Sequence, residues 1–242
     1  MKIFRQLVGN TVYQYESVDE QDKHYDTRKI HKELKEKIVQ KQKVVNLMQP
    51  LENTRFIIFD TETTGFSPAK GDRIISLGAV VLENGKINET DVFHRMVNPN
   101  RSIPREITEL TGIDNEMVLN ADSFYHVFRD FLDFIDNGVL VAHNANFDIA
   151  FINAMLKQYR VKFKYPVIDT LKISYSLYNC IKTHSLDHLL DLNKINPEGR
   201  HSALGDSILT AKLLKTFLAK LQKQQVKSLL DLFNYIHYHE CC

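Results

Sequence analysis

The chain has 242 residues, of which 43% are hydrophobic and 25% are charged, which is an ordinary globular composition. A formal net charge of +1 gives the whole molecule no basic signature for nucleic acid, so any attraction for phosphate must come from local patches or bound cations. No run of about 18 apolar residues is present, which excludes a membrane-spanning helix, and the 3 cysteines include no CxxC pair that would indicate zinc. The first residues lack the apolar core of a signal peptide, so we expect a cytoplasmic protein.

Residues 1–52 form a lysine-rich segment that is predicted to be a largely helical extension. Between Arg28 and Lys43 the sequence has seven Lys or Arg residues but only two Glu residues. Apolar residues recur near helical spacing at Ile30, Leu34, Ile38 and Val45. Two interpretations stay open. The segment is either a solvated amphipathic helix that packs on the main domain, or a basic arm that holds a nucleic-acid backbone or a partner protein.

The main domain is expected over residues 53–222, with strands first and then strands alternating with helices. A buried strand, FIIF, precedes Asp60, and two further strands are joined by a turn at Asn84 and Gly85. Helical patterns follow at 104–110, 114–119, 124–135, 146–159, 171–177, 185–192 and 203–221, with strands at 138–143 and 166–169 between them. This order predicts an α/β domain with a mixed sheet flanked by helices. The tail, residues 223–242, is compatible with a final helix.

Asp60 and Glu62 end the first strand of this domain. Side chains two residues apart in a strand point to the same face, so both carboxylates can converge on one site. Paired carboxylates at a buried edge repel each other unless cations neutralise them, and Mg²⁺ or Mn²⁺ prefer such oxygen ligands. A DxE pair alone is common, and it can equally be a polar strand end.

Asp148 follows the strand that ends in VLVAH, in the first turn of the next helix. An acid in a first turn often only compensates the helix dipole. A neighbouring strand that ends in Asp60 favours the other interpretation, because two adjacent strand ends would bring the acids together.

His201 and Asp206 lie in HSALGD, at the start of the longest predicted helix. A loop histidine with an ordinary pKa near 6.5 suits removal of a proton from water. Alternatively, His201 is a surface residue and Asp206 is a first-turn acid. Four acids and one histidine taken together fit a two-metal phosphoryl-transfer site.

The motifs FDTETTG, AHNANFD and HSALGD resemble those of the DEDDh branch of the DnaQ-like 3′–5′ exonucleases. This family includes the proofreading subunits and domains of bacterial replicative polymerases, such as the DNA polymerase III epsilon type. Further matches are ISLGAVVLENGKI, VNPNRSIPREITELTGIDNEMV, VIDTL and HSLDHLL, and the resemblance covers roughly residues 55–221. It implies a ribonuclease H-like fold with a mixed five-stranded sheet. Ser202 and Ser207 depart from relatives, which often carry a larger polar residue and alanine there.

The resemblance also implies a role for each motif residue. Asp60 would bridge two divalent cations, Mg²⁺ or Mn²⁺, while Glu62 and Asp206 would bind the cation on the nucleophile side. Asp148 would serve the other cation, and His201 would be the general base. The residues implied to hold the terminal nucleotide are Thr61, Thr63, His143, Asn144 and Phe147.

The resemblance predicts hydrolysis of single-stranded or frayed 3′ ends of DNA to nucleoside 5′-monophosphates. The enzyme would act alone or as a proofreading subunit bound to a DNA polymerase. Two alternatives stay open: trimming of RNA with the same chemistry, and a binding module without catalysis. The presence of all five site residues argues against the second.

Overall fold

The computed structural model describes residues 4–8, 11–15, 27–41 and 46–240. Its centre is a five-stranded sheet in the order β5-β4-β3-β6-β7. In chain order the strands of this sheet are β3 (Phe56–Thr63), β4 (Ile74–Glu83), β5 (Lys86–Met96), β6 (Val139–Ala142) and β7 (Val167–Asp169). Strand β3 pairs antiparallel with β4 and parallel with β6, so the sheet is mixed, as the sequence predicts.

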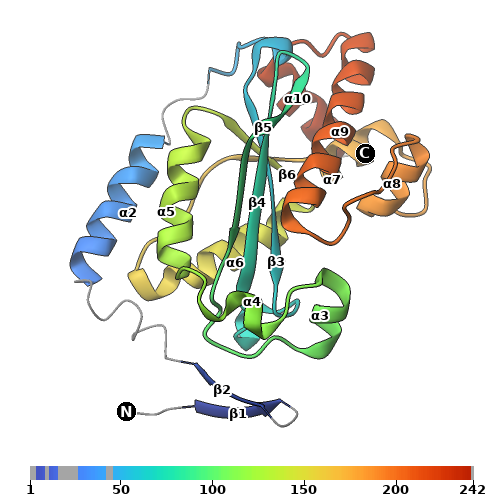
Figure 1. The fold of residues 1–242 in the computed structure, drawn as a ribbon. Coiled ribbons are helices and arrows are strands. Elements are labelled where there is room, and N and C mark those ends of the chain that lie inside the picture. The colour runs from blue at the N-terminus through green and yellow to red at the C-terminus, as the bar shows by residue number, and fades with distance from the viewer. Residues whose placement is uncertain (1–3, 9–10, 16–26, 42–45, 241–242) are drawn as a thin grey trace.

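Helices cover both faces of this sheet (Figure 1). In the chain, β5 is followed by α3 (Arg105–Thr111), α4 (Asn115–Leu119) and α5 (Phe124–Ile135), and α6 (Ala145–Leu156) lies between β6 and β7. After the last strand come α7 (Thr170–Leu177), α8 (Leu186–Leu192), α9 (Ala203–Lys223) and α10 (Leu229–Glu240). The described residues also form the short 3₁₀ turns η1 (Leu51–Asn53), η2 (Pro68–Lys70) and η3 (Lys157–Tyr159). Among the described residues, no helix is both long enough and apolar enough to cross a membrane.

Two apolar cores lie on opposite faces of the sheet because side chains alternate along each strand. Ile57 and Phe59 of β3 belong to the core that α5 and α6 cover. Phe56 and Ile58 of the same strand belong to the core that α7, α8, α9 and α10 cover. A strand buried on both faces reads as a continuous apolar run, which explains the FIIF sequence.

The first 52 residues are not purely helical, although the sequence predicts a largely helical extension. Strands β1 (Phe4–Val8) and β2 (Thr11–Tyr15) form an antiparallel pair, and helix α2 (Thr27–Lys41) follows. Helix α2 buries Ile30, Leu34 and Ile38 in the core shared with α5, so this helix packs on the main domain. Val45 lies outside the described residues.

The tail forms helix α10, and its position is fixed by main-chain hydrogen bonds. The amide groups of Leu229 and Leu230 donate to the carbonyl groups of Gln49 and Leu47, at 3.1 and 2.8 Å. Leu232 and Ile236 are buried in the core with α9. The expected helix over 146–159 divides in two: α6 ends at Leu156, and the 3₁₀ turn η3 completes it.

Candidate active site

Asp60 and Glu62 lie on the same face of the sheet, because they are two residues apart on strand β3. They share that face with Phe56 and Ile58, whose side chains lie in the core under α9. Thr61 lies between them and faces α6, because its hydroxyl donates to Asp148 at the start of that helix. The carboxylates of Asp60 and Glu62 are therefore presented to α9.

Helix α9 approaches the sheet closely at Gly78 of β4. Gly78 is the residue opposite Asp60 in the antiparallel register. A Cβ atom at Gly78 would lie 2.3 Å from the carbonyl carbon of Ala203, so only glycine lets the first turn of α9 rest on the strand. The hydroxyl of Ser207 donates to the carbonyl oxygen of Gly78 at 3.0 Å. These contacts place Asp206, in the first turn of α9, next to Asp60.

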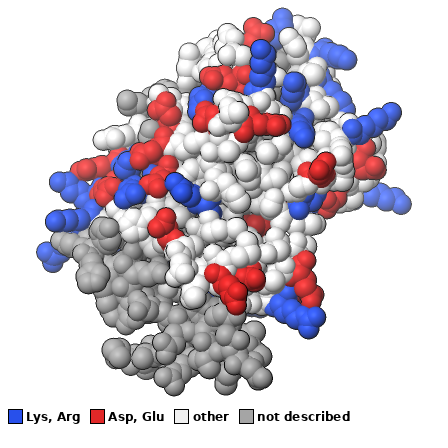
Figure 2. Space-filling view, viewed as in Figure 1, with Lys and Arg blue, Asp and Glu red and all other residues white. Residues whose placement is uncertain are grey.

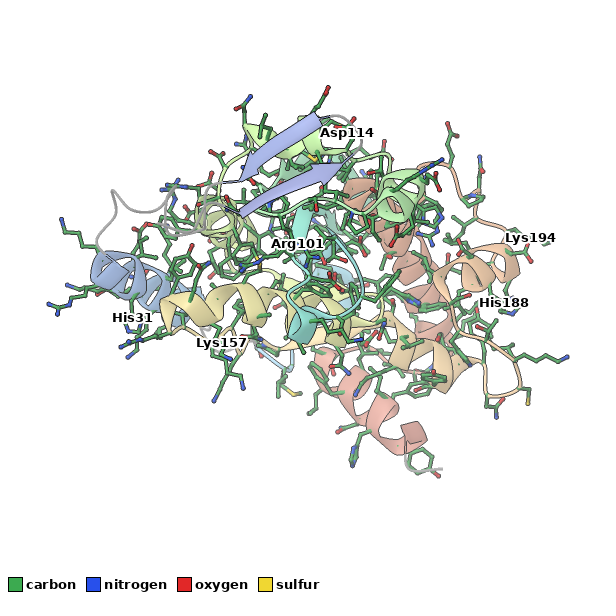
Figure 3. The ribbon with its side chains drawn as sticks, turned by 90° about the horizontal axis from the view of Figure 1, so that it is seen from below. His31, Arg101, Asp114, Lys157, His188 and Lys194 are labelled. Carbon is green, nitrogen blue, oxygen red and sulfur yellow. The ribbon has the colours of Figure 1, made fainter. Side chains whose placement is uncertain are left out.

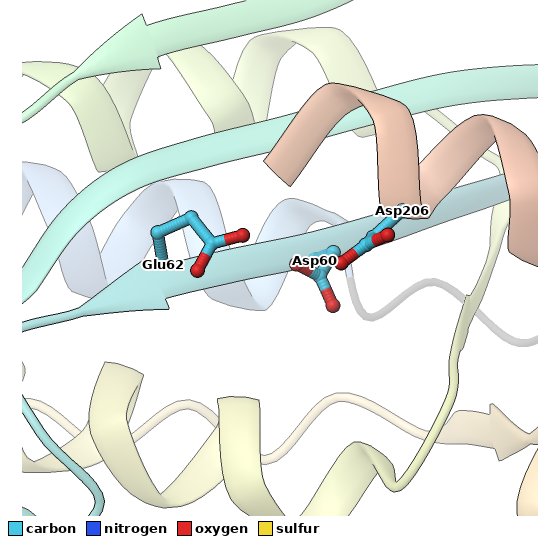
Figure 4. Close-up of side chains that lie close together, drawn as sticks. All are labelled: Asp60, Glu62 and Asp206. Carbon is cyan, nitrogen blue, oxygen red and sulfur yellow. The ribbon is translucent and has the colours of Figure 1, made fainter. Parts of the chain in front are cut away.

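Asp60, Glu62 and Asp206 form a cluster, here called the acid cluster. Each contributes one carboxylate oxygen, and these atoms all lie within 4.8 Å of one another (Figure 4). The Oδ1 atom of Asp206 is buried and receives no hydrogen bond from the described residues. Three converging carboxylates with an unsatisfied oxygen fit a hard divalent cation, which takes oxygen ligands and neutralises their charge.

Burial and mutual repulsion hold the protons of these acids tightly in the absence of a cation. Burial raises the pKa of Asp60 well above its usual value, and the charges of Asp148, Asp206 and Glu62 raise it further. Burial also raises the pKa of Glu62 to about 7, with Asp206 adding to the effect and Arg200 opposing it. The cluster is thus a place where positive charge is strongly favoured.

Asp148 lies beside Asp60 but outside the acid cluster. It is buried in the first turn of α6, and its Oδ1 atom accepts hydrogen bonds from the amide and the hydroxyl of Thr61, at 3.0 and 2.7 Å. Burial raises the pKa of Asp148 to about 7, although the hydrogen bonds from Thr61 act in the opposite direction. The other oxygen of this carboxylate is not used by Thr61, so Asp148 keeps a ligand atom for a cation.

Arg200 is a site residue that the sequence analysis did not single out. Its guanidinium donates to both carboxylate oxygens of Asp187 on α8, at 2.6 and 3.2 Å, and it pairs with Asp206. The arginine therefore neutralises part of the acid cluster and ties it to α8. Asp187 lies in HSLDHLL, but neither residue has a spacing that would have revealed the contact.

His201 lies in the turn between Arg200 and the start of α9, as the sequence predicts. It is exposed and has a left-handed backbone with φ of 61°. Its charge lowers the pKa of Asp187 and of Asp206, which shows that it lies near both carboxylates. An exposed imidazole near the acid cluster is the arrangement that the predicted role of general base requires.

The residues expected to hold a terminal nucleotide surround the start of α6. The Nδ1 atom of His143 lies 2.9 Å from the hydroxyl of Thr170, and Asn144 is exposed with a left-handed φ of 60°. Asp169 was not predicted as a site residue, although it lies in VIDTL. Its carboxylate accepts from the amides of Asn144 and Ala145, at 2.9 and 3.1 Å, and so fixes the turn into the helix.

Three of the residues expected to hold the nucleotide make contacts within the protein. The hydroxyl of Thr63 donates to the carbonyl oxygen of Gly65 at 2.5 Å, and the hydroxyl of Thr61 is held by Asp148. The ring of Phe147 packs on that of Phe151 with centroids 4.8 Å apart. These residues shape the wall of the site, and their contact with a nucleotide stays a prediction.

Residues 57–214 match the exonuclease family RNase_T. The chain belongs to this exonuclease family. It is 41% identical over 177 residues to "DNA polymerase III PolC-type" of Caldanaerobacter subterraneus subsp. tengcongensis, a match that covers 73% of this chain and 12% of that protein. It is 36% identical over 185 residues to "3'-5' exonuclease DinG" of Bacillus subtilis, covering 75% of this chain and 19% of that protein. The chain therefore spans less than a fifth of the length of either relative.

The nuclease domain of 3'hExo, described as a DEDDh family member bound to rAMP, has a similar fold. The TM-score is 0.64 at 23% identity, and the match covers 71% of this chain and 95% of that domain. The predicted ribonuclease H-like fold and the predicted relation to DnaQ-like exonucleases are confirmed by these similarities. The enzyme class expected from the motifs, an exonuclease, is confirmed at the level of the family.

Proposed function

We propose that this exonuclease hydrolyses DNA from its 3′ end and releases nucleoside 5′-monophosphates, with divalent cations as cofactors. The observation that carries the proposal is the acid cluster, whose three carboxylates converge within 4.8 Å. Relatives whose names refer to DNA polymerase III and to 3′–5′ exonuclease support the substrate and the direction.

Asp60, Glu62 and Asp206 are the residues that would hold Mg²⁺ or Mn²⁺, with Asp148 available on the Asp60 side. We propose two cations, because the acid cluster and Asp148 together carry four negative charges when ionised and one divalent cation neutralises only two of them. Divalent cations in such sites activate water and stabilise the charge that develops on the phosphate. The protein supplies the acidic edge of the sheet that would hold these cations.

His201 is the proposed general base. The two histidines of the family motifs, His143 and His201, differ in burial. Burial lowers the pKa of His143 to about 4, so this ring is neutral near pH 7, and its Nδ1 atom is held by Thr170. His201 is exposed next to Asp206, where it can take a proton from the attacking water and pass it to solvent.

A single-stranded 3′ end suits the rim of the site better than paired DNA. Phe66 follows β3 by three residues and is 74% exposed, an unusual position for a large aromatic ring. Bases without a paired partner stack on exposed aromatic rings irrespective of sequence. Asn144, which is exposed at the start of α6, offers an amide for hydrogen bonds with the last nucleotide.

A role in proofreading is a second proposal, favoured by the names of the polymerase relatives. It requires association with a DNA polymerase, and a preference for frayed ends. The chemistry at the acid cluster would be the same as in an enzyme that acts alone.

The proposal is tested with 5′-labelled single-stranded DNA, duplex, mismatched duplex and RNA, each with Mg²⁺ or Mn²⁺. We expect a ladder of products shortened from the 3′ end, and a turnover rate lower by a factor on the order of a thousand in Asp60→Asn.

The Asp60→Asn variant should fold, because the substitution removes a buried charge that the metal-free protein disfavours. Full activity in the variant would refute the site, and preference for RNA would refute the substrate. Preference for the mismatch would support proofreading.

A further inference from the structure

Arg73 is a positively charged residue that lies beside the end of the strand bearing Asp60 and Glu62. The amide of Arg73 donates to the hydroxyl of Thr64 at 3.0 Å, so it lies directly beside the end of the acid-bearing strand. Its guanidinium reaches the sulfur of Met155 on α6 at 3.7 Å, and no carboxylate among the described residues forms an ion pair with it. Burial lowers the pKa of Arg73, and the nearby guanidinium of Arg101 lowers it further. Asp72 neutralises only Arg101, at 3.0 Å.

The surface next to Arg73 is hollowed. A cavity of about 310 Å³ opens between η2 and the end of α6, and Arg73 and Lys157 both line it. Lys157 is exposed, as is Arg160 three residues further on. The cavity is therefore lined by a cation on each side, Arg73 before β4 and Lys157 at the start of η3.

Helix α2 continues this positive surface away from the site. The Nδ1 atom of His31 donates to the carbonyl oxygen of Tyr159 in η3 at 2.9 Å, which joins the two elements. Lys29, Lys32 and Lys35 lie on the exposed face of α2. Of the two acids on this helix, Glu33 faces α5, where its carboxylate accepts from the hydroxyl of Tyr125 at 2.6 Å. Glu36 lies 3.9 Å from Lys32 in an exposed pair, which contributes little and leaves Lys29 and Lys35 without a carboxylate partner among the described residues.

Figure 3 labels one residue of η3, Lys157, and one residue of α2, His31, and shows both on the same side of the molecule. Figure 3 shows Arg101 near the centre of the molecule, Lys157 beyond it, and His31 at the outer edge, whereas Lys194 lies on the opposite side. Figure 2 shows Lys and Arg side chains projecting from the edge where α2 lies, with Asp and Glu side chains among them, and further Lys and Arg side chains projecting from the opposite upper edge.

We propose that these cations form a basic strip that holds the phosphate backbone of the substrate strand behind its 3′ end. The basic strip consists of Arg73, Lys157, Arg160, Lys29, Lys32 and Lys35. It rests on the proposed function, since it begins at the site where the last phosphodiester would be cut. A linear row of cations fits a phosphate backbone better than a compact acidic protein surface. The nine residues from Asp148 to the end of α6 span about 12 Å, so Lys157 and the cations of α2 lie well behind the site, where the body of a bound strand would pass.

The test compares two triple variants of the full chain by fluorescence anisotropy with single-stranded DNA of 15 nucleotides, in EDTA and over a salt series. One variant is Lys29→Gln, Lys157→Gln and Arg160→Gln. The matched control is Lys215→Gln, Lys223→Gln and Lys227→Gln, which removes three exposed lysines toward the C-terminal end of α9 and just after it. We expect about tenfold weaker binding only in the strip variant, with a salt slope smaller by about 2.

Hydrolysis of a trinucleotide separates this inference from the proposed function. We expect the strip variant to keep the wild-type rate on the trinucleotide, because so short a substrate reaches only the start of the strip at Arg73, which the variant leaves unchanged. Equal weakening in both triple variants, or no weakening in the strip variant, would overturn the inference. Loss of binding to poly-glutamate with unchanged binding to DNA would also overturn it and would point to an acidic protein partner. Absence of hydrolysis by the wild type would refute the proposed function alone, since anisotropy in EDTA reports on the strip without catalysis.

Discussion

Gly78 lies opposite Asp60 across the antiparallel pair of β3 and β4, and the first turn of α9 rests on it. One glycine without a side chain thus sets the distance between the strand that carries Asp60 and the helix that carries Asp206. Ser207 strengthens the same contact through its hydrogen bonds to the carbonyl oxygens of Gly78 and Ala203. The acid cluster is therefore assembled by backbone packing as well as by the acids themselves.

Gly78→Ala should damage activity more than stability. The added methyl group would meet the backbone of Ala203 and Leu204 at 2.3 Å, so the start of α9 must move away from β3. Overpacking of this kind costs about 1–3 kcal/mol, whereas displacement of a metal ligand should reduce turnover by about a hundredfold or more. The measurements are thermal unfolding and nuclease rate. Ser207→Ala is the matched control, because it removes hydrogen bonds worth about 1 kcal/mol but adds no atom. Wild-type turnover in Gly78→Ala would contradict the packing argument.

Arg200→Met should make the metal-free protein less stable and more responsive to divalent cations. Removal of the guanidinium leaves the carboxylate of Asp206, whose side chain is 9% exposed, without its partner and costs about 3 kcal/mol. A bound cation would then relieve more repulsion than in the wild type, so its stabilising effect should grow. The measurement is the melting temperature in EDTA and at increasing Mn²⁺. Arg105→Met is the control, because its pairing with Glu109 is largely exposed and contributes little. An identical Mn²⁺ response in wild type and Arg200→Met would rule out competition between arginine and cation.

The sequence predicts the parts of this site that follow from local periodicity. Asp60 and Glu62 could be placed on one face of a strand because the pleat has a period of two, and Asp148 and Asp206 fell at helix starts because apolar spacing and turn residues mark them. The turn at Asn84 and Gly85 was likewise predictable, and the structure has β4 end and β5 begin on either side of it.

The other parts of the site depend on contacts between distant segments, which no local pattern encodes. The approach of α9 to Gly78 joins positions 125 or more residues apart in the chain. The hydrogen bonds from Thr61 to Asp148 span 87 residues, and the link from Arg200 to Asp187 spans 13 without any helical spacing. The hairpin of β1 and β2 was missed because the lysine-rich pattern that follows it dominated the prediction for residues 1–52.

The metal-free protein should lose stability as pH rises from about 4.5 to about 7. The pKa values of Glu62 and Asp148 are raised to about 7 by burial, so the folded state keeps protons that the unfolded chain has already released. Below pH 4 both states are protonated and no penalty arises. Above pH 7 both are ionised and the full penalty of the buried charges is present. Thermal unfolding in EDTA measures this slope, and Mg²⁺ should reduce it at high pH. Glu62→Gln should flatten the slope, and an unchanged slope in that variant would contradict the assignment.

His201→Ala should reduce turnover by about a hundredfold or more while metal binding is retained. The imidazole is exposed and makes no contact needed for the acid cluster, so its loss should remove proton transfer alone. The measurement combines nuclease rate with the Mn²⁺-induced shift in melting temperature. His188→Ala, on α8, is the matched control, and it should keep both properties. Unchanged turnover in His201→Ala would exclude this histidine as the base.

Leu34→Ala should destabilise the whole exonuclease domain, although Leu34 lies far from the family motifs in sequence. Helix α2 buries Leu34 with no exposed surface, in the same core as Phe59 and Phe128, so truncation leaves a cavity that costs about 2–5 kcal/mol. Val39→Ala is a control on the same helix, because Val39 is 60% exposed and its loss should be nearly neutral. Urea unfolding monitored by circular dichroism and by nuclease activity should show one shared transition. If α2 were only a basic arm, the two variants would unfold at the same urea concentration. A larger loss in Leu34→Ala would instead show that the helix is part of the folded domain, with its exposed cations left available for a partner.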